Sequence, residues 1–120
     1  DMEIMRRYMT CLRDEGLTEQ LFILIGIGPI ASALSARWMR ENLWGVIIPD
    51  HIIERLESAE DEREEGRKVC VELIQELAEI DGIAGVHVMA IRQEDAIPGI
   101  LEAAGVGPAH RDNGANPAAI

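Results

Sequence analysis

An uninterrupted apolar stretch near the amino end of the chain, LFILIGI from Leu21 to Ile27, dominates its hydrophobic pattern. A run this short, without polar alternation and closed by the letters GIGP, is typical of a strand buried on both faces. Ser32 then fits a helix N-cap, and helical spacing continues to about Asn42. The residues expected to be buried on this helix are Leu34, Trp38 and Met39. A buried strand, a glycine turn and a helix form the unit from which parallel sheets and barrels are built.

Helical spacing predicts further helices on both sides of that unit. Apolar residues recur through the first twelve positions and Gly16 ends the pattern, so a first helix precedes the strand. It should bury Ile4, Met5, Tyr8, Met9 and Leu12. A short helix begins at Pro49 or Asp50, and a long helix spans about Asp61–Ile80. The acidic run Glu57–Glu65 should be solvated. The long helix should bury Val69, Cys70, Leu73, Ile74 and Leu77.

A second buried strand, Ile83–Ile91, follows the Asp81-Gly82 break, and a last helix ends at Gly105. Residues 46–48 form either a short strand or an extended link, because the proline that follows disfavours helix. The two firm strands should be parallel neighbours joined by a helical crossover. Two strands are too few for a stable sheet, and a complete barrel needs roughly 250 residues. The chain is therefore interpreted as α/β, with about two β/α units from the carboxyl-terminal part of a larger barrel.

Composition narrows the class of protein. The formal net charge of −11 argues against binding to nucleic acid or to an anionic membrane, because both need a cationic surface. No apolar run approaches the roughly 18–20 residues of a membrane span, and no signal peptide is visible. Cys11 and Cys70 share no CxxC spacing and are expected to be reduced, buried thiols in a cytoplasmic protein. No residues have metal-ligand spacing, and we expect no metal.

Five short segments, in order, carry a resemblance to a known family. They read GIGPI at 26–30, GVIIP at 45–49, EG at 65–66, GVHVMA at 85–90 and ILEAAG at 100–105. At this spacing the set resembles the end of the methylenetetrahydrofolate reductase family, most of all its short bacterial members. The resemblance implies a TIM-type (β/α)8 barrel in which the two strands are the seventh and eighth. It also implies FAD at the carboxyl ends of the strands, with folate stacked on the flavin. Residues 1–106 would be a fragment of this barrel, and residues 107–120 a flexible tail.

The family's strand-eight pattern, His-aromatic-Tyr-Thr-Leu-Asn-Arg, is matched by residues 87–93 here. Gln93 stands where family members have an Arg that binds folate. Ile91 stands where they have a Leu that packs on folate. By this comparison, the substrate-binding residues are Ile23, Ile91, Arg92 and Gln93. The expected flavin-binding residues are Gly26, Gly28, His87 and Met89. The family's catalytic acid lies on the first strand, so the resemblance implies no catalytic residue within this chain.

Several alternatives stay open at the level of sequence. His87 is either a structural, hydrogen-bonded barrel residue or a group near the flavin. Residues 26–28 lack the GxGxxG and Walker patterns, yet a phosphate site in this place is typical of barrels. The implied function is reduction of 5,10-methylenetetrahydrofolate by reduced FAD; the alternative is a non-catalytic half-barrel module that completes a partner chain. The electron donor is NAD(P)H or a protein, and we expect an oligomer.

Overall fold

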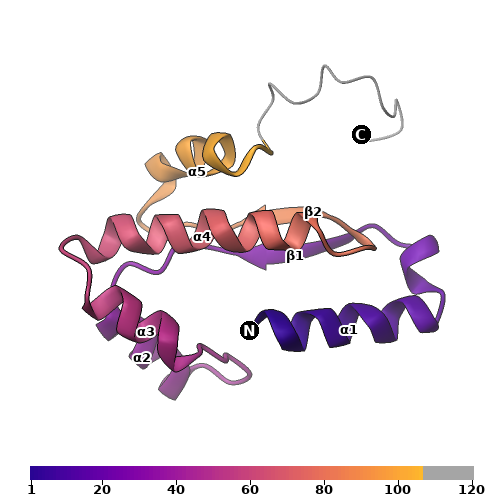
Figure 1. Ribbon diagram of the computed structural model, residues 1–120, viewed down its shortest axis with the longest axis horizontal. Helices are drawn as coiled ribbons and strands as arrows, with labels where there is room; N and C mark the ends of the chain where they lie inside the picture. Colours follow the sequence, from indigo (N-terminus) through magenta and orange to yellow (C-terminus); the bar gives the residue numbers. More distant parts are fainter. Residues whose placement is uncertain (107–120) are drawn as a thin grey trace.

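The computed structural model describes residues 1–106, and the expected tail at 107–120 lies outside the described residues. The described chain is α/β, with a two-stranded parallel sheet and five α-helices (Figure 1). The elements are α1 (Met2–Asp14), β1 (Ile23–Ile27), α2 (Ala33–Asn42), α3 (Asp50–Glu57), α4 (Glu62–Ala78), β2 (Ile83–Val88) and α5 (Ile97–Ala104). Short 3-10 helices, η1 (Leu17–Glu19) and η2 (Glu94–Ala96), follow α1 and precede α5.

The two strands are parallel neighbours, as predicted. Ile25 pairs with Val86, and Ile27 pairs with Val88. The ladder continues one residue further, because the N–H of Met89 donates to the carbonyl of Ile27 at 2.7 Å. Three helices, α2, α3 and α4, make the crossover between the strands. The connection therefore has the length that parallel pairing requires.

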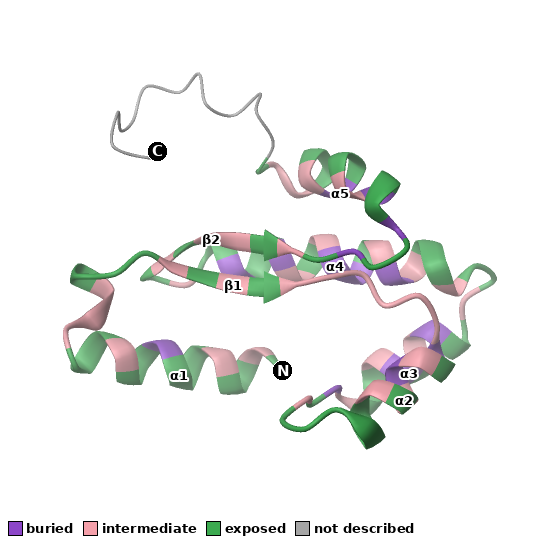
Figure 2. Cartoon of the chain, turned by 180° about the vertical axis from the view of Figure 1, so that it is seen from behind, coloured by how far each residue is buried: buried purple, intermediate pink, exposed green. Residues whose placement is uncertain are grey.

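Helices cover only one face of this sheet. Ile27, Val86 and Val88 pack against a buried cluster from α4 and the segment around α5. The members of that cluster are Cys70, Ile74, Ala96 and Ile100. Figure 2 looks on to the other face, where exposed and half-buried residues alternate along β1. Leu24 on this open face is 61% exposed. The prediction of strands buried on both faces is therefore wrong for residues 1–106, because no element among them covers the second face.

The first helix makes fewer buried contacts than its sequence predicted. Met9 is buried, but Ile4, Tyr8 and Cys11 are exposed. Met9 reaches the Gly82 turn, where its Cε would lie 3.2 Å from an added Cβ. The expected apolar stripe of α1 is thus mostly unpacked, and the prediction that Cys11 is buried is wrong. The periodicity was correct for a helix, but among the described residues its neighbours, such as the Gly82 turn and Glu76 of α4, cover only part of its apolar stripe.

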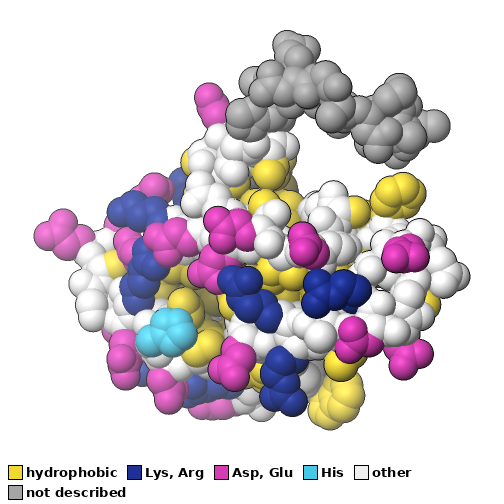
Figure 3. All heavy atoms as spheres, turned by 45° about the vertical axis from the view of Figure 1, so that its right-hand side comes forward, with side chains coloured by type: hydrophobic (Ala, Val, Ile, Leu, Met, Phe, Trp, Pro, Cys, Tyr) yellow, Lys and Arg dark blue, Asp and Glu magenta, His cyan; other side chains and the backbone are white. Residues whose placement is uncertain are grey.

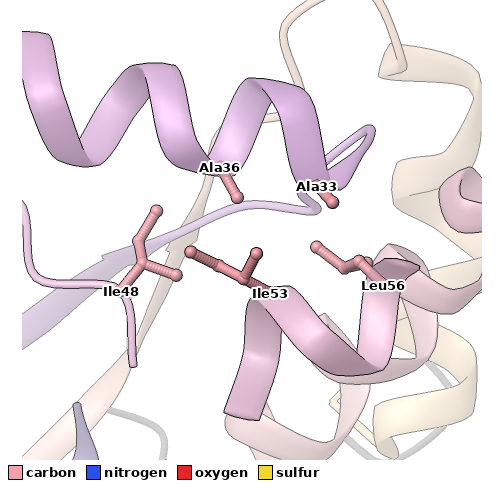
Figure 4. Close-up of a cluster of buried hydrophobic side chains, with 5 residues drawn as sticks. All are labelled: Ala33, Ala36, Ile48, Ile53 and Leu56. Carbon is pink, nitrogen blue, oxygen red and sulfur yellow. The ribbon is translucent and has the colours of Figure 1, made fainter. Parts of the chain in front are cut away.

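The α2–α3 pair forms a small core of its own. Its buried members, shown in Figure 4, are Ala33, Ala36, Ile48, Ile53 and Leu56. Leu34 and Trp38, which were expected to be buried, are exposed, and Met39 is half-buried. The reason is that α2 turns its alanines towards α3, which places its larger apolar side chains on other faces. Residues 46–48 form an extended link rather than a strand, and Ile48 joins the core.

The long helix α4 begins at its N-cap Asp61, whose side chain accepts from the N–H of Glu64 at 3.0 Å. Its predicted buried stripe is confirmed except for Leu73, which is half-buried. Arg55 of α3 joins the two helices through Glu65 at 2.6 Å and Glu72 at 2.5 Å. The hydrogen bonds from Arg55 lower the pKa of Glu65 and of Glu72. The same bonds raise the pKa of Arg55, and the bond to Glu72 has the larger effect. The acidic run is therefore partly structural rather than only solvated.

Charged side chains of both signs are interspersed on the surface, with hydrophobic side chains exposed among them (Figure 3). Ion pairs such as Arg40–Asp50 at 2.6 Å and Arg6–Glu76 at 3.5 Å neutralise part of the negative charge. Arg37 and Glu57 form another pair between α2 and α3, and their hydrogen bond lowers the pKa of Glu57. Exposed pairs of this kind each contribute about 0–1 kcal/mol, so the α2–α3 contact depends mainly on its apolar core.

Candidate functional site at the strand ends

The carboxyl ends of β1 and β2 meet at one edge of the sheet, because the strands are parallel. In Figure 2 both arrowheads point to the end of the molecule where α2 and α3 lie. The chain leaves β1 through residues 28–32 and leaves β2 through residues 89–93. Functional sites of parallel β/α proteins form at this edge, and most of the residues predicted from the sequence lie here.

Three of the predicted flavin-binding residues come together on the open face. Gly26 and His87 are register partners, and Met89 follows two residues after His87 on the same side of the strand. An added Cβ on Gly26 would lie 3.2 Å from the Cε of Met89, so the flexible Met89 side chain covers Gly26. Met89 itself is 53% exposed. The result is an apolar surface that ends in a side chain able to move aside.

Gly28 has a different environment from Gly26. An added Cβ would lie 1.9 Å from the carbonyl oxygen of Met89, a contact with rigid backbone. The missing side chain therefore lets the two strand ends pack main chain to main chain. The Met89 backbone therefore fills this side of Gly28 and leaves no room there for a ligand.

His87 is exposed, and within residues 1–106 no side-chain hydrogen bond reaches it. The hydrogen bond of a structural histidine is thus absent among the described residues, and the two interpretations of His87 stay open. The reason for this absence is the open face: the imidazole projects from the side of the sheet that the helices leave uncovered. A ligand or another segment seated on that face would contact it.

A tight turn, not a strand, follows β2. The N–H of Gln93 donates to the carbonyl of Ala90 at 2.8 Å, and Arg92 has a φ of 61°. Ile91 at the tip is 84% exposed, whereas Gln93 is 3% exposed. The predicted strand Ile83–Ile91 is therefore too long, because β2 ends at Val88, and the turn places Ile91 and Gln93 in different environments. Positive φ is uncommon for a residue with a long side chain, and such positions cluster at functional sites.

The buried Gln93 amide is incompletely bonded. Its Oε1 is buried and has no hydrogen-bond partner among the described residues. Its backbone carbonyl, in contrast, accepts from the N–H of Ala96 at 2.9 Å as η2 begins. Native proteins leave few buried polar atoms unpaired, so an orphaned oxygen beside a candidate site points to an absent partner.

Ile23 lies apart from these residues. It pairs with Ile83 at the amino end of the sheet, and it alternates in phase with Ile25 and Ile27 on the helix-covered face. Its assignment to the substrate site stays a prediction, which this position does not support. Leu24, which the sequence did not single out, lies on the open face with Gly26 instead. Strand alternation gave the signal, since residues two apart share a face.

Two N–H groups at the start of α2 already have hydrogen-bond partners within the chain. The N–H of Ala33 donates to Glu62 Oε2 at 2.8 Å, and the N–H of Ser35 donates to the Ser32 hydroxyl at 3.1 Å. These contacts occupy two of the N–H groups with which the helix end could bind an anion. The phosphate alternative for residues 26–28 gains no support from the start of α2 and stays a prediction. Sequence reasoning missed Glu62 because it lies within an acidic run and 29 residues from its partner.

Two further observations concern the described part of the chain. Within residues 1–106, no group of three His, Cys, Asp or Glu side chains is placed to hold a metal ion. Among the helices of the same region, none has the length and hydropathy of a membrane span.

Fold and site together define an α/β protein with a parallel sheet and an open, apolar candidate site at its strand ends. The family model for methylenetetrahydrofolate reductase matches residues 1–105, and the chain belongs to this family. Membership places it with the oxidoreductases of folate metabolism. Searches of curated proteins and of solved structures gave no significant match.

Proposed function

We propose that this chain supplies the carboxyl-terminal two β/α units of a flavin-dependent reductase that converts 5,10-methylenetetrahydrofolate to 5-methyltetrahydrofolate. The observation that carries the proposal is the open face at the strand ends, where Gly26, His87 and Met89 meet. The family match to residues 1–105 supports it. Residues 1–106 would then be one part of the barrel, with β1 and β2 as its seventh and eighth strands.

The residues of the open face fit the ring system of FAD. A flat ring needs an apolar surface with close access to backbone, and Gly26 and Leu24 offer one. Met89 would lie against the ring edge after moving from Gly26, and His87 would offer a hydrogen-bonding group beside it. FAD, when bound, would supply hydride transfer. The chain's own residues would orient the ring and exclude water from it.

The turn after β2 fits the folate substrate. Ile91 presents an exposed apolar side chain, Arg92 a cation, and Gln93 an unpaired amide oxygen. A pterin has apolar faces and a hydrogen-bonding edge, and folate carries carboxylates that a guanidinium can bind. The unusual backbone of Arg92 supports a functional role for this turn.

The remaining barrel units would complete the enzyme. Each strand of the sheet has one unpaired edge, and the open face is apolar, so further β/α units would cover both. These units would carry the catalytic acid and the rest of the flavin site. The proposal includes NAD(P)H or a protein as electron donor, an oligomeric enzyme, and a cytoplasmic location.

A second candidate function is a non-catalytic module that completes the barrel of a partner chain. The free sheet edges favour this candidate as much as they favour the enzyme. The presence of bound flavin distinguishes the two candidate functions. We would purify the protein together with the polypeptide that supplies the other barrel units and measure flavin absorbance. We expect bound flavin that is oxidised by methylenetetrahydrofolate in a single turnover after reduction. A complete assembly without flavin would instead support the non-catalytic module.

A further inference from the structure

The loop that leaves β1, residues 28–32, is held between two neighbours. On one side, Gly28 packs against the backbone of Met89 at the proposed flavin site. On the other side, it meets the first turns of α4, which lie at the same end of the molecule as α2 and α3 (Figure 1). The position of this loop thus depends on an element that makes no direct contribution to the open sheet face.

The first contact with α4 is between backbones. An added Cβ on Gly66 would lie 1.8 Å from the carbonyl oxygen of Ile30 and 2.9 Å from its carbonyl carbon. Gly66 is buried. Any larger residue here would force the loop or the helix to move, because neither atom belongs to a flexible side chain.

The second contact is between a carboxylate and a helix end. Glu62 Oε2 accepts the N–H of Ala33 at 2.8 Å, and this N–H belongs to the first residue of α2. A negative charge is favourable at the positive end of a helix, and a hydrogen bond to a charged acceptor is stronger than a neutral one. Glu62 therefore fixes the far end of the loop.

We propose that Glu62 and Gly66 are positioning residues of the proposed site at the strand ends, where flavin and folate would meet, and that they act through the loop at residues 28–32. This inference rests on the proposed function. With both contacts in place, the loop keeps Gly28 against Met89 and leaves the open face free for ligand. Without them, the loop samples other positions, and only a fraction of molecules remains competent to bind.

The decisive variant is Glu62→Ala, measured in the flavin-loaded assembly. We expect its Kd for methyltetrahydrofolate to rise roughly fivefold, the factor for loss of one hydrogen bond at a helix N-terminus. Flavin content is measured in parallel, because the loop packs at the proposed flavin site. Glu62→Gln retains an acceptor oxygen and should restore the Kd to within about twofold of the parent. Glu64→Ala is the matched control, because Glu64 lies in the same turn of α4 and only approaches Arg67, at 3.5 Å. It should bind folate like the parent.

A matched pair of variants also tests the contact between Gly66 and Ile30. Gly66→Ala should weaken folate binding more than Glu62→Ala does, whereas Gly99→Ala should have no effect, because nothing lies within 4 Å of its added Cβ. If Gly66→Ala fails to fold, the Glu62 series decides alone. Amide exchange at Ala33 provides a readout independent of folate, and we expect it to accelerate at least tenfold in Glu62→Ala.

Each outcome has a distinct meaning. Unchanged exchange at Ala33 in Glu62→Ala would overturn the contact, and with it the positioning role. Accelerated exchange with a parent-like Kd for folate would overturn the positioning role alone. A parent assembly that binds flavin but no folate would overturn the proposed function, and the positioning role with it.

Discussion

The carbonyl oxygen of Met89 lies 1.9 Å from the place where a Cβ of Gly28 would stand. The two residues belong to the ends of neighbouring strands, and this contact brings their backbones together at the candidate site. Gly26, two residues earlier, meets only the tip of the Met89 side chain, at 3.2 Å. The two glycines therefore have different roles, one in packing and one on the open face.

Alanine substitution separates these roles. Gly28→Ala should lower the free energy of unfolding by about 2 kcal/mol or more, because the new methyl group meets rigid backbone. Gly26→Ala should cost less than about 1 kcal/mol, because the Met89 side chain can move away. Denaturant unfolding of the two variants, each in the assembly with the other barrel units, measures the difference. Equal losses would show that the Met89 backbone does not lie against Gly28.

Gln93→Met tests the orphaned amide. Because Oε1 is buried without a partner among the described residues, its replacement by an apolar side chain of similar length should leave stability unchanged or raise it by about 1 kcal/mol. If folate is the absent partner, its affinity should fall by about 1 kcal/mol, roughly fivefold. Thermal unfolding and flavin absorbance during a methyltetrahydrofolate titration measure the two effects.

Ile91→Asp provides the comparison within the same turn. Ile91 is exposed, so the substitution should change stability by less than about 0.5 kcal/mol. It should weaken folate binding more than Gln93→Met does, because it would place a carboxylate against the apolar face of the pterin in the proposed site. Parent-like folate binding by this variant would remove the turn from the substrate site.

The Arg55 network predicts a pH dependence. Hydrogen bonds from Arg55 lower the pKa of Glu65 and Glu72 below the ordinary value of 4.5, so their contribution to stability is present above that value. It is lost as the pH falls through the lowered pKa values of the folded state. Arg55→Met should therefore be less stable than the parent at pH 7, and the difference should shrink below about pH 4.5. A difference that is constant down to pH 3 would contradict this explanation.

The two cysteines should differ in reactivity. Burial raises the pKa of Cys70 to about 11, whereas Cys11 is exposed. Because the thiolate is the reactive form, a chromogenic disulfide reagent at pH 8 should modify Cys11 quickly and Cys70 only after unfolding. The matched variant Cys11→Ser should show almost no fast phase. A fast phase that persists in it would mean that the packing of α4 against α5 opens readily.

Residues 1–120 alone should self-associate or fold poorly. The sheet has two free edges and an open apolar face that includes Leu24 and Met89, and such surfaces associate with other chains. Sedimentation velocity of the parent and of Leu24→Lys measures this, and the charged variant should associate less. A cooperative thermal transition from a dilute, proven monomer would refute the expectation.

Local patterns in the sequence predicted local structure well. The Ser32 cap, the Gly16 and Gly105 helix ends, and the parallel pairing of two strands all agree with the structure. These features depend on backbone geometry and on neighbours close in sequence, so a single chain reveals them. The ordered glycine-containing segments also indicated the family that the match to residues 1–105 shows.

The sequence by itself thus determined the helices, the two strands and the family. Only the tertiary structure decided which apolar residues are buried, because a periodic stripe shows that a face exists and not whether anything covers it. Leu34 and Leu24 look like core residues in sequence, yet both are exposed. The tertiary structure also shows that β2 ends at Val88 and that Ile91 is exposed whereas Gln93 is buried. It further shows the hydrogen bond between Glu62 and the N–H of Ala33. These relationships depend on turns and on contacts between distant segments, which hydrophobic periodicity does not encode.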